Sequence, residues 1–160
     1  MDIEGYEKKQ PLYSSVYEYT AKKTETSKES NMKYEIAFDE KNKVLRAELK
    51  DKFEPENAAA FFKDIGAYTE EQQRYCIFNV YEDAQKMVDK ETRKILSAGA
   101  KGLKWQKVAI KGAKASLRMV AKIVLVGAGK GLEVKFFDTD EDAYSWLNAE
   151  RDKAIKKASQ

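Results

Sequence analysis

Residues 105–147 decide the fold, and they read WQKVAIKGAKASLRMVAKIVLVGAGKGLEVKFFDTDEDAYSWL. The hydrophobic period changes along this stretch, which predicts a strand, a loop, a helix, a second strand and the start of a second helix. In the predicted middle helix, residues 114–126, the only charged side chains are Lys114, Arg118 and Lys122, spaced four apart. At about 100° per residue, these three cations form one narrow stripe along the helix. Apolar residues cover about half of the helix surface, so the helix is amphipathic with a basic edge.

The length of the chain favours one domain. Its 160 residues can bury a proper hydrophobic core but are too few for two ordinary domains. The charged content is 36%, yet 30 basic residues nearly balance 27 acidic ones and give a net charge of +3. Proteins that bind duplex nucleic acid usually concentrate a larger basic excess on one face, so we expect no nucleic-acid partner.

Residue types that many enzymes and metal sites need are scarce in this chain. Histidine, the usual general base and the commonest zinc ligand, is absent, and Cys76 is the only cysteine. We therefore expect no internal disulfide, no metal and no cofactor. Residues 1–10 lack the apolar core of a signal peptide, and the longest apolar run, residues 123–128, is too short to cross a bilayer. The expected location is the cytoplasm.

The predicted domain organisation has three parts. Residues 1–31 contain four tyrosines among polar residues and hold no helical or strand period, which predicts a flexible N-terminal arm. This arm is either a disordered tail, which base rates favour, or a docking segment that uses its tyrosines. Residues 32–155 form the folded domain, and residues 156–160 form a C-terminal tail.

Within the domain, the hydrophobic pattern predicts elements in the order ββαβαβαβα. Alternating apolar residues on both sides of a polar turn at 39–42 predict a β-hairpin. The near-continuous apolar run at 74–81 predicts a central strand covered on both faces. Asp89 is the expected N-cap of one helix, and Asp138 or Thr139 that of the last. The fold class is therefore α/β: a mostly parallel five-stranded sheet with an antiparallel N-terminal hairpin and four helices.

Two segments resemble a known family. VAIKGAKASLRMVAKI at 108–123 and FFDTDEDAYSWL at 136–147 are similar to the SpoIIAA-like branch of the STAS superfamily. The resemblance extends over residues 33–150 in the order of elements. It implies a non-enzymatic STAS-like domain, related in fold to the CRAL-TRIO lipid carriers, that binds a protein or a ligand and has a regulatory role. A homodimer is compatible with this resemblance, and the sequence leaves the oligomeric state open.

One departure from the wider superfamily affects the expected mechanism. Anti-sigma factor antagonists carry a phosphorylatable serine at the start of the helix that follows the central strand. The equivalent region here, residues 81–92, reads YEDAQKMVDKET and has no serine near the expected position. The resemblance therefore gives no support to a phosphoserine switch, and Asp89 in this region is explained as a helix cap.

Two further motifs resemble binding loops but fail their own requirements. GAGKG at 127–131 lacks the first glycine and the Ser or Thr of a phosphate-binding loop, and it follows a helix instead of a strand. Asp138, Asp140 and Asp142 begin like a calcium-binding loop, but Ala143 and Ala149 stand where that loop needs glycine and glutamate. An acidic first helical turn explains the three aspartates.

The basic stripe is the candidate functional site. Residues 92–132 contain no Asp or Glu but many lysines, which predicts a local positive field in a nearly neutral chain. A solvated helix face is the simpler explanation of the stripe, whereas the basic field favours an anionic partner. The predicted anion-binding residues are Lys111, Lys114, Arg118 and Lys122, and the predicted apolar ligand-binding or membrane-facing residues are Met119, Ile123 and Val126.

Two functions follow from this site. In the first, the protein binds a lipid or an anionic membrane surface, at the inner face of the membrane, with head groups on the cations and hydrocarbon on the apolar residues. In the second, it is a regulatory adaptor whose basic face docks an acidic protein. An enzyme is the weakest alternative, because no nucleophile with a neighbouring base can be named.

Overall fold

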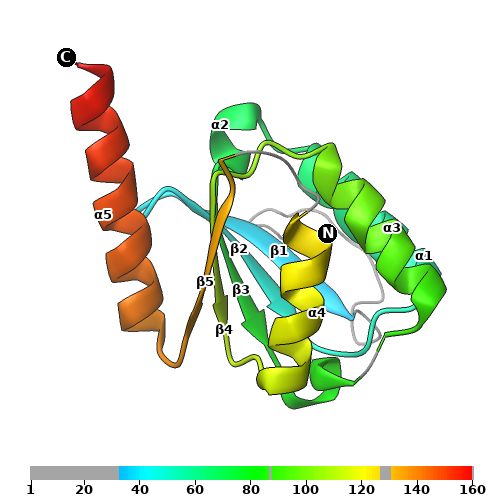
Figure 1. Cartoon of the computed structure of the whole chain (residues 1–160). Coiled ribbons are helices and arrows are strands. Elements are labelled where there is room, and N and C mark those ends of the chain that lie inside the picture. The colour runs from blue at the N-terminus through cyan, green and yellow to red at the C-terminus, as the bar shows by residue number, and fades with distance from the viewer. Residues whose placement is uncertain (1–32, 87, 127–130, 160) are drawn as a thin grey trace, which may run out of the picture.

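The computed structural model describes residues 33–86, 88–126 and 131–159. The predicted N-terminal arm, residues 1–31, lies outside these ranges. Five strands form one sheet in the order β1-β2-β3-β4-β5 (Figure 1). β1 is antiparallel to β2, and the other neighbours run parallel. The predicted α/β class, with an antiparallel hairpin at the edge of a mostly parallel sheet, is confirmed.

The structure contains more helical segments than the four predicted helices. The strands are β1 (Tyr34–Asp39), β2 (Val44–Leu49), β3 (Tyr75–Val80), β4 (Lys107–Lys111) and β5 (Glu133–Phe137). The helices are α1 (Pro55–Gly66), α2 (Glu70–Gln73), α3 (Lys90–Lys101), α4 (Ala115–Val126) and α5 (Asp140–Ala158), with a 3₁₀ helix η3 (Glu82–Gln85) before α3. The additional elements are η3 and α2, a single turn. Residues 156–158, which the sequence assigns to a tail, continue α5.

The helices form two layers, one on each face of the sheet. Successive parallel strands are sheet neighbours, and right-handed crossovers then place the connecting helices on a single face. These are α1, α3 and α4, called here the three-helix layer, while α5 covers the opposite face alone (Figure 1). Strand β3 separates the layers: Cys76 and Phe78 point toward the three-helix layer, and Tyr75 and Ile77 toward α5. Burial on both faces explains the near-continuous apolar run of β3.

Local side-chain bonds set the ends of several elements as predicted. In the hairpin turn, the Asp39 carboxylate accepts hydrogen bonds from the backbone N and Nδ2 of Asn42, at 3.0 and 2.9 Å. Asp89 caps α3 by accepting from the backbone N of Thr92 at 2.7 Å. Thr139 caps α5, with its hydroxyl accepting from the third residue of the helix at 3.1 Å. Of the two predicted caps of the last helix, the structure therefore selects Thr139.

Aromatic rings fill much of the space between the sheet and the three-helix layer. The Phe61 ring contacts the Phe78 ring edge-on, with centroids 5.9 Å apart, and Phe78 contacts Trp105 in the same way at 5.5 Å. Phe53 and Phe62 extend this cluster on either side of Phe61, at 5.3 and 5.4 Å. These rings belong to the core between the sheet and the helices α1, α3 and α4.

Candidate binding surface on helix α4

A left-handed turn positions the start of α4. Gly112, directly after β4, has φ +88°, a conformation that L side chains rarely adopt. A Cβ atom at this position would lie 2.7 Å from the carbonyl oxygen of Val80, the last residue of β3. The close approach of the two backbones therefore requires glycine, and it fixes the direction in which the chain leaves the sheet for α4.

The side chain of Gln85 bridges η3 to this turn. Its Nε2 donates to the carbonyl oxygen of Gly112 at 2.7 Å, and its Oε1 accepts from the backbone N of Lys114 at 3.0 Å. The backbone carbonyl of Lys114 then accepts from the backbone N of Arg118 at 2.9 Å, which is the first helical hydrogen bond of α4. The orientation of α4 is thus set at its start by both backbone geometry and a side-chain bridge.

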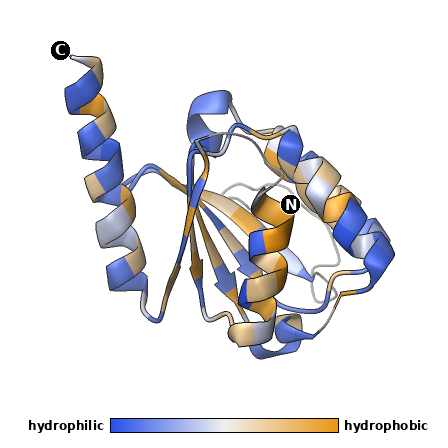
Figure 2. Cartoon of the chain, in the orientation of Figure 1, coloured by the Kyte–Doolittle hydropathy of each residue, from blue (hydrophilic) through white to orange (hydrophobic). Residues whose placement is uncertain are grey.

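One side of α4 packs into the core. Its inward-facing residues recur at helical spacing and belong to the core beneath the three-helix layer: Leu117, Val120, Ala121, Val124 and Leu125. Figure 2 shows that α4 is hydrophobic over most of its length, whereas α5 is mainly hydrophilic. Helix α4 therefore has more apolar residues than those that pack into the core.

A cavity lies under the inward side of α4, called here the α4 cavity. Its volume is about 120 Å³. Its walls come from α4, from α1 and α3, and from the carboxyl ends of β2, β3 and β4. They are almost entirely hydrocarbon, and Asp51 is the one ionisable residue among the described residues that line the cavity. The Asp51 carboxylate accepts a hydrogen bond from the backbone N of Lys52 at 2.7 Å.

The opposite side of α4 leaves two large apolar side chains in solvent. Met119 is 66% exposed and Ile123 is 64% exposed. They are four residues apart, so they lie next to each other along the helix. The side chain of Val126, the third predicted apolar residue, lies outside what the structure describes. We call Met119, Ile123 and the adjacent, exposed Lys122 the outward face of α4.

Two of the predicted cations converge on one aromatic ring. The guanidinium carbon of Arg118 lies 5.2 Å from the centroid of the Phe136 ring, and Lys122 Nζ lies 5.9 Å from it. Arg118 also donates from Nε to the carbonyl oxygen of Ala113 at 2.8 Å, and its Nη2 lies 3.8 Å from an oxygen of Asp138. Arg118 is therefore partly committed to holding α4 against β5. Lys122 is the freer cation.

The other two predicted cations point elsewhere. Lys114 Nζ forms an ion pair with Glu82 of η3 at 2.7 Å, at the start of α4. Lys111 lies at the end of β4 on the α5 face of the sheet, and its Nζ lies 3.3 Å from Asp140. The predicted set is therefore divided in space: Arg118 and Lys122 are together, Lys114 is at the helix start, and Lys111 is on the other face.

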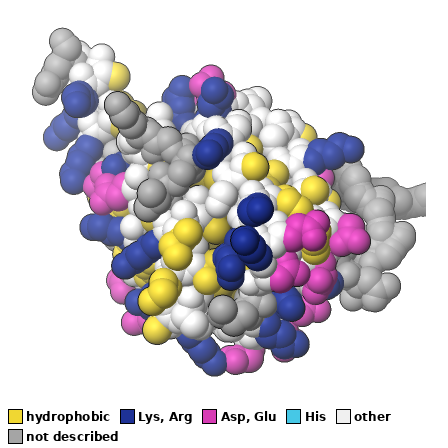
Figure 3. All heavy atoms as spheres, turned by 45° about the vertical axis from the view of Figure 1, so that its right-hand side comes forward, with side chains coloured by type: hydrophobic (Ala, Val, Ile, Leu, Met, Phe, Trp, Pro, Cys, Tyr) yellow, Lys and Arg dark blue, Asp and Glu magenta, His cyan; other side chains and the backbone are white. Residues whose placement is uncertain are grey.

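Acids from distant segments neutralise part of the predicted basic field. In addition to the pairs just described, Lys107 contacts Glu133 and Glu150, with Nζ–oxygen distances of 2.8 and 3.3 Å. Within the described ranges, no acidic side chain forms an ion pair with Lys122. Figure 3 shows the resulting surface, where hydrophobic side chains lie beside lysines and arginines and a group of acidic side chains lies to their right. Three of the four predicted cations therefore have acidic neighbours, and Lys122 has no acidic partner among the described residues.

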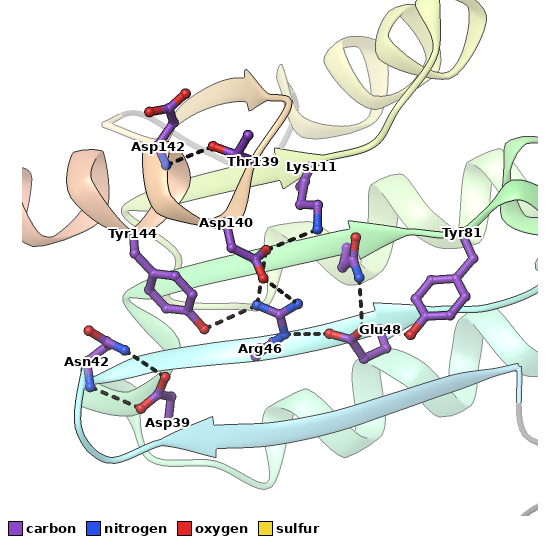
Figure 4. Close-up of polar contacts among 11 residues, drawn as sticks. Asp39, Asn42, Arg46, Glu48, Tyr81, Lys111, Thr139, Asp140, Asp142 and Tyr144 are labelled. Carbon is purple, nitrogen blue, oxygen red and sulfur yellow. Dashed lines mark hydrogen bonds and ion pairs between the residues drawn. The ribbon is translucent and has the colours of Figure 1, made fainter.

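The α5 face carries a polar network that the sequence did not predict. Arg46 of β2 contacts Glu48 (Nε–Oε2 2.5 Å), the hydroxyl of Tyr144 (3.2 Å) and Asp140 (3.4 Å) (Figure 4). The other carboxylate oxygen of Glu48 accepts from Tyr81 and from Asn79 Nδ2, both at 2.9 Å.

The charged side chains of this network form ion pairs with one another. Burial alone would lower the pKa of Arg46, but its bonds with Tyr144 and Glu48 outweigh burial and raise that pKa above its usual value. Arg46 and Lys111 are balanced by Glu48 and Asp140. A network with paired charges and mutual hydrogen bonds tethers the start of α5 to the sheet, and we assign it a structural role.

The Cys76 thiol and the possible metal ligands were the remaining sequence features with potential chemistry. Cys76 is fully buried, and desolvation raises the pKa of its thiol, which disfavours the thiolate that nucleophilic attack needs. Among residues 33–86, 88–126 and 131–159, no group of three or more Cys, Asp or Glu side chains could hold a metal ion.

The fold and site define a class: a mixed α/β protein with a three-helix layer on one face of its sheet and one helix on the other. The chain matches no protein-family model, no curated protein and no solved structure. In the part of the chain that the structure describes, no helix combines the length and the apolar character needed to span a membrane.

The sequence predicted neither the α4 cavity nor the polar network on the α5 face. The aromatic walls of the cavity were visible in the sequence only as core residues, because apolar periodicity reports which side of an element is buried and not how completely the space is filled. The polar network did leave a signal: Arg46 and Glu48 are two residues apart in β2, so their side chains share one face of the sheet.

Proposed function

We propose that this protein is a non-enzymatic STAS-like binding module that attaches to anionic lipid surfaces through the outward face of α4. The exposure of Met119 and Ile123 beside Lys122 is the observation that carries the proposal. Isolated exposed apolar residues are common on soluble proteins. Two neighbouring ones beside an exposed lysine on an amphipathic helix are typical of a helix that lies in a membrane interface.

The energies are those of weak, reversible attachment. Moving the Met119 and Ile123 side chains from water into hydrocarbon contributes about 2–4 kcal/mol in total. Lys122 near an anionic surface contributes about 1 kcal/mol. Lys114 and Arg118 add less, because Glu82 and Asp138 already neutralise part of their charge. A sum of about 4 kcal/mol strengthens binding by about a thousandfold.

The remaining structure is consistent with a peripheral role. The inward side of α4 stays packed on the core, so only its outward face reaches the lipid. The resemblance of residues 108–123 and 136–147 to the SpoIIAA-like branch supports a binding module over an enzyme. Those segments include α4 itself and the strand that contributes Phe136.

Co-sedimentation with vesicles tests the proposal. The unmodified protein should pellet with phosphatidylcholine vesicles that contain phosphatidylglycerol, should not pellet with phosphatidylcholine alone, and should lose binding as salt is raised. Lys122→Glu reverses one charge and should weaken binding by about thirtyfold. Met119→Ser combined with Ile123→Ser should weaken it by at least about tenfold.

The matched control is on α5, where Ile155 is 60% exposed but belongs to a mainly hydrophilic helix. Ile155→Ser combined with Lys157→Glu makes the same kinds of change and should leave vesicle binding intact. If the unmodified protein fails to pellet with anionic vesicles, or if the α5 variant loses as much binding as the α4 variants, lipid attachment through α4 is wrong. The first of these outcomes favours the adaptor that docks an acidic protein.

A further inference from the structure

We infer that the α4 cavity is a binding site for a small, uncharged, apolar molecule of about the size of one aromatic ring. This site lies on the inward side of α4, so it is separate from the proposed lipid surface on the outward side. The two can be tested independently.

The cavity lies between the sheet and the three-helix layer, near the ends of three strands. Leu49, Val80 and Ile110 contribute to its wall, and they are at or next to the last residues of β2, β3 and β4. Ligand pockets in proteins are concave and lined mainly by hydrophobic and aromatic side chains, as this cavity is. The helices α1, α3 and α4 contribute further walls, and the cavity is partly open to solvent.

The size of the cavity exceeds an ordinary packing defect. Protein interiors are close-packed and contain few voids larger than a water molecule. The α4 cavity measures about 120 Å³. An apolar cavity of about 150 Å³ stays dry and binds benzene. A single ring or a short hydrocarbon is therefore close in size to this cavity.

The apolar walls disfavour bound water and negatively charged ligands. Phe53, Phe61, Phe62, Phe78 and Trp105 all contribute to the lining. Ring edges and faces attract another aromatic ring in edge-to-face or offset contact. A water molecule in a cavity needs two to four polar partners, which these walls do not supply. A negatively charged ligand would lose its hydration without a compensating charge, because Asp51, the one ionisable residue among the described lining residues, is itself an acid.

Toluene is a suitable probe, with benzoate as the charged analogue. Toluene should bind saturably to the full-length protein and raise its Tm, because it binds the folded state only. In methyl NMR spectra, the shifted signals should be those of lining residues such as Ile110, Val120 and Val124. Benzoate should do neither.

Substitutions within α4 separate the cavity from the surface. Ala121 lines the cavity, whereas Ala115 is exposed at the helix start and does not. Ala121→Phe fills the cavity and should weaken toluene binding by at least about tenfold, whereas Ala115→Phe should leave it within about twofold. Lys122→Glu should leave toluene binding unchanged, and Ala121→Phe should leave vesicle binding unchanged.

If the unmodified protein shows no saturable shift of its methyl NMR signals with toluene up to the solubility of toluene, the inference is wrong. This test does not depend on whether Ala121→Phe folds. Shifts confined to the methyl groups of Met119 and Ile123, on the outward face, would overturn it equally. Equal binding of toluene and benzoate would also do so.

Discussion

Gly112→Ala is the substitution whose effect can be worked out most completely from the structure. Two independent costs apply at this position. The backbone has φ +88°, where a residue with a Cβ costs about 1–2 kcal/mol. The new Cβ would also lie 2.7 Å from the carbonyl oxygen of Val80, which is backbone and cannot rotate away. Relieving such an overlap costs about 1–3 kcal/mol.

Together these costs lower the free energy of unfolding by about 2–5 kcal/mol. The overlap also pushes the start of α4 away from β3, which strains the two hydrogen bonds of Gln85. Urea denaturation followed by circular dichroism measures the loss as a lower transition midpoint with an unchanged slope. For a chain of this length, each kcal/mol also lowers the Tm by about 2–4 °C.

Substitutions at two other glycines separate the cost of the positive φ from the cost of the close contact with Val80. Gly131 has φ +90° but open space around the site of a Cβ, so Gly131→Ala should cost only the backbone term, about 1–2 kcal/mol. Gly66, the last residue of α1, also has open space and lacks a positive φ, so Gly66→Ala should stabilise by about 0.5 kcal/mol. If Gly112→Ala costs no more than Gly131→Ala, the close contact with Val80 does not shape this turn.

Three further predictions concern stability. The Tyr34 hydroxyl donates to Asp64 at 2.6 Å, and burial together with this bond raises the pKa of Tyr34. The stabilising effect of this bond should therefore be complete below about pH 10 and decline above it. Tyr34→Phe should cost about 1 kcal/mol at neutral pH and flatten the alkaline decline of stability in urea titrations, whereas an unchanged decline would refute the role of Tyr34. Thr139→Ala removes the cap of α5 and should cost about 1 kcal/mol by the same assay, whereas an unaltered midpoint would refute the cap. A double-mutant cycle with Arg118→Met and Phe136→Leu should give a coupling of about 0.5–1 kcal/mol, and zero coupling would refute the cation–π contact.

The parts of the fold that local pattern controls could be predicted from the sequence. The run at 74–81 is apolar without alternation, and β3 is indeed the strand buried under both layers. The amphipathic pattern of residues 114–126 placed α4 correctly, because the period of its apolar residues reports which side is buried. Asp89 and the hairpin turn at 39–42 were predicted because their side chains bond to backbone within three residues.

The features that depend on distant segments could not be predicted. Sequence spacing placed Lys111, Lys114, Arg118 and Lys122 in one basic field, but the acids that pair with the first three come from η3, from Asp138 and from the start of α5. Which lysine stays free is decided only when these elements fold together. The α4 cavity is similarly non-local, because it results from the way bulky side chains of three helices and three strands fail to fill the space between them.

Fluorescence of a dye at Met119 tests lipid attachment through α4 most directly. Cys76 is buried, so an environment-sensitive dye should react with the new thiol of Met119→Cys, and Ile155→Cys provides a label of similar exposure on α5. On addition of phosphatidylglycerol-containing vesicles, the emission of the dye at 119 should shift to the blue and the emission of the dye at 155 should stay unchanged. Equal shifts at the two positions, or no shift at 119, would contradict attachment through the outward face of α4.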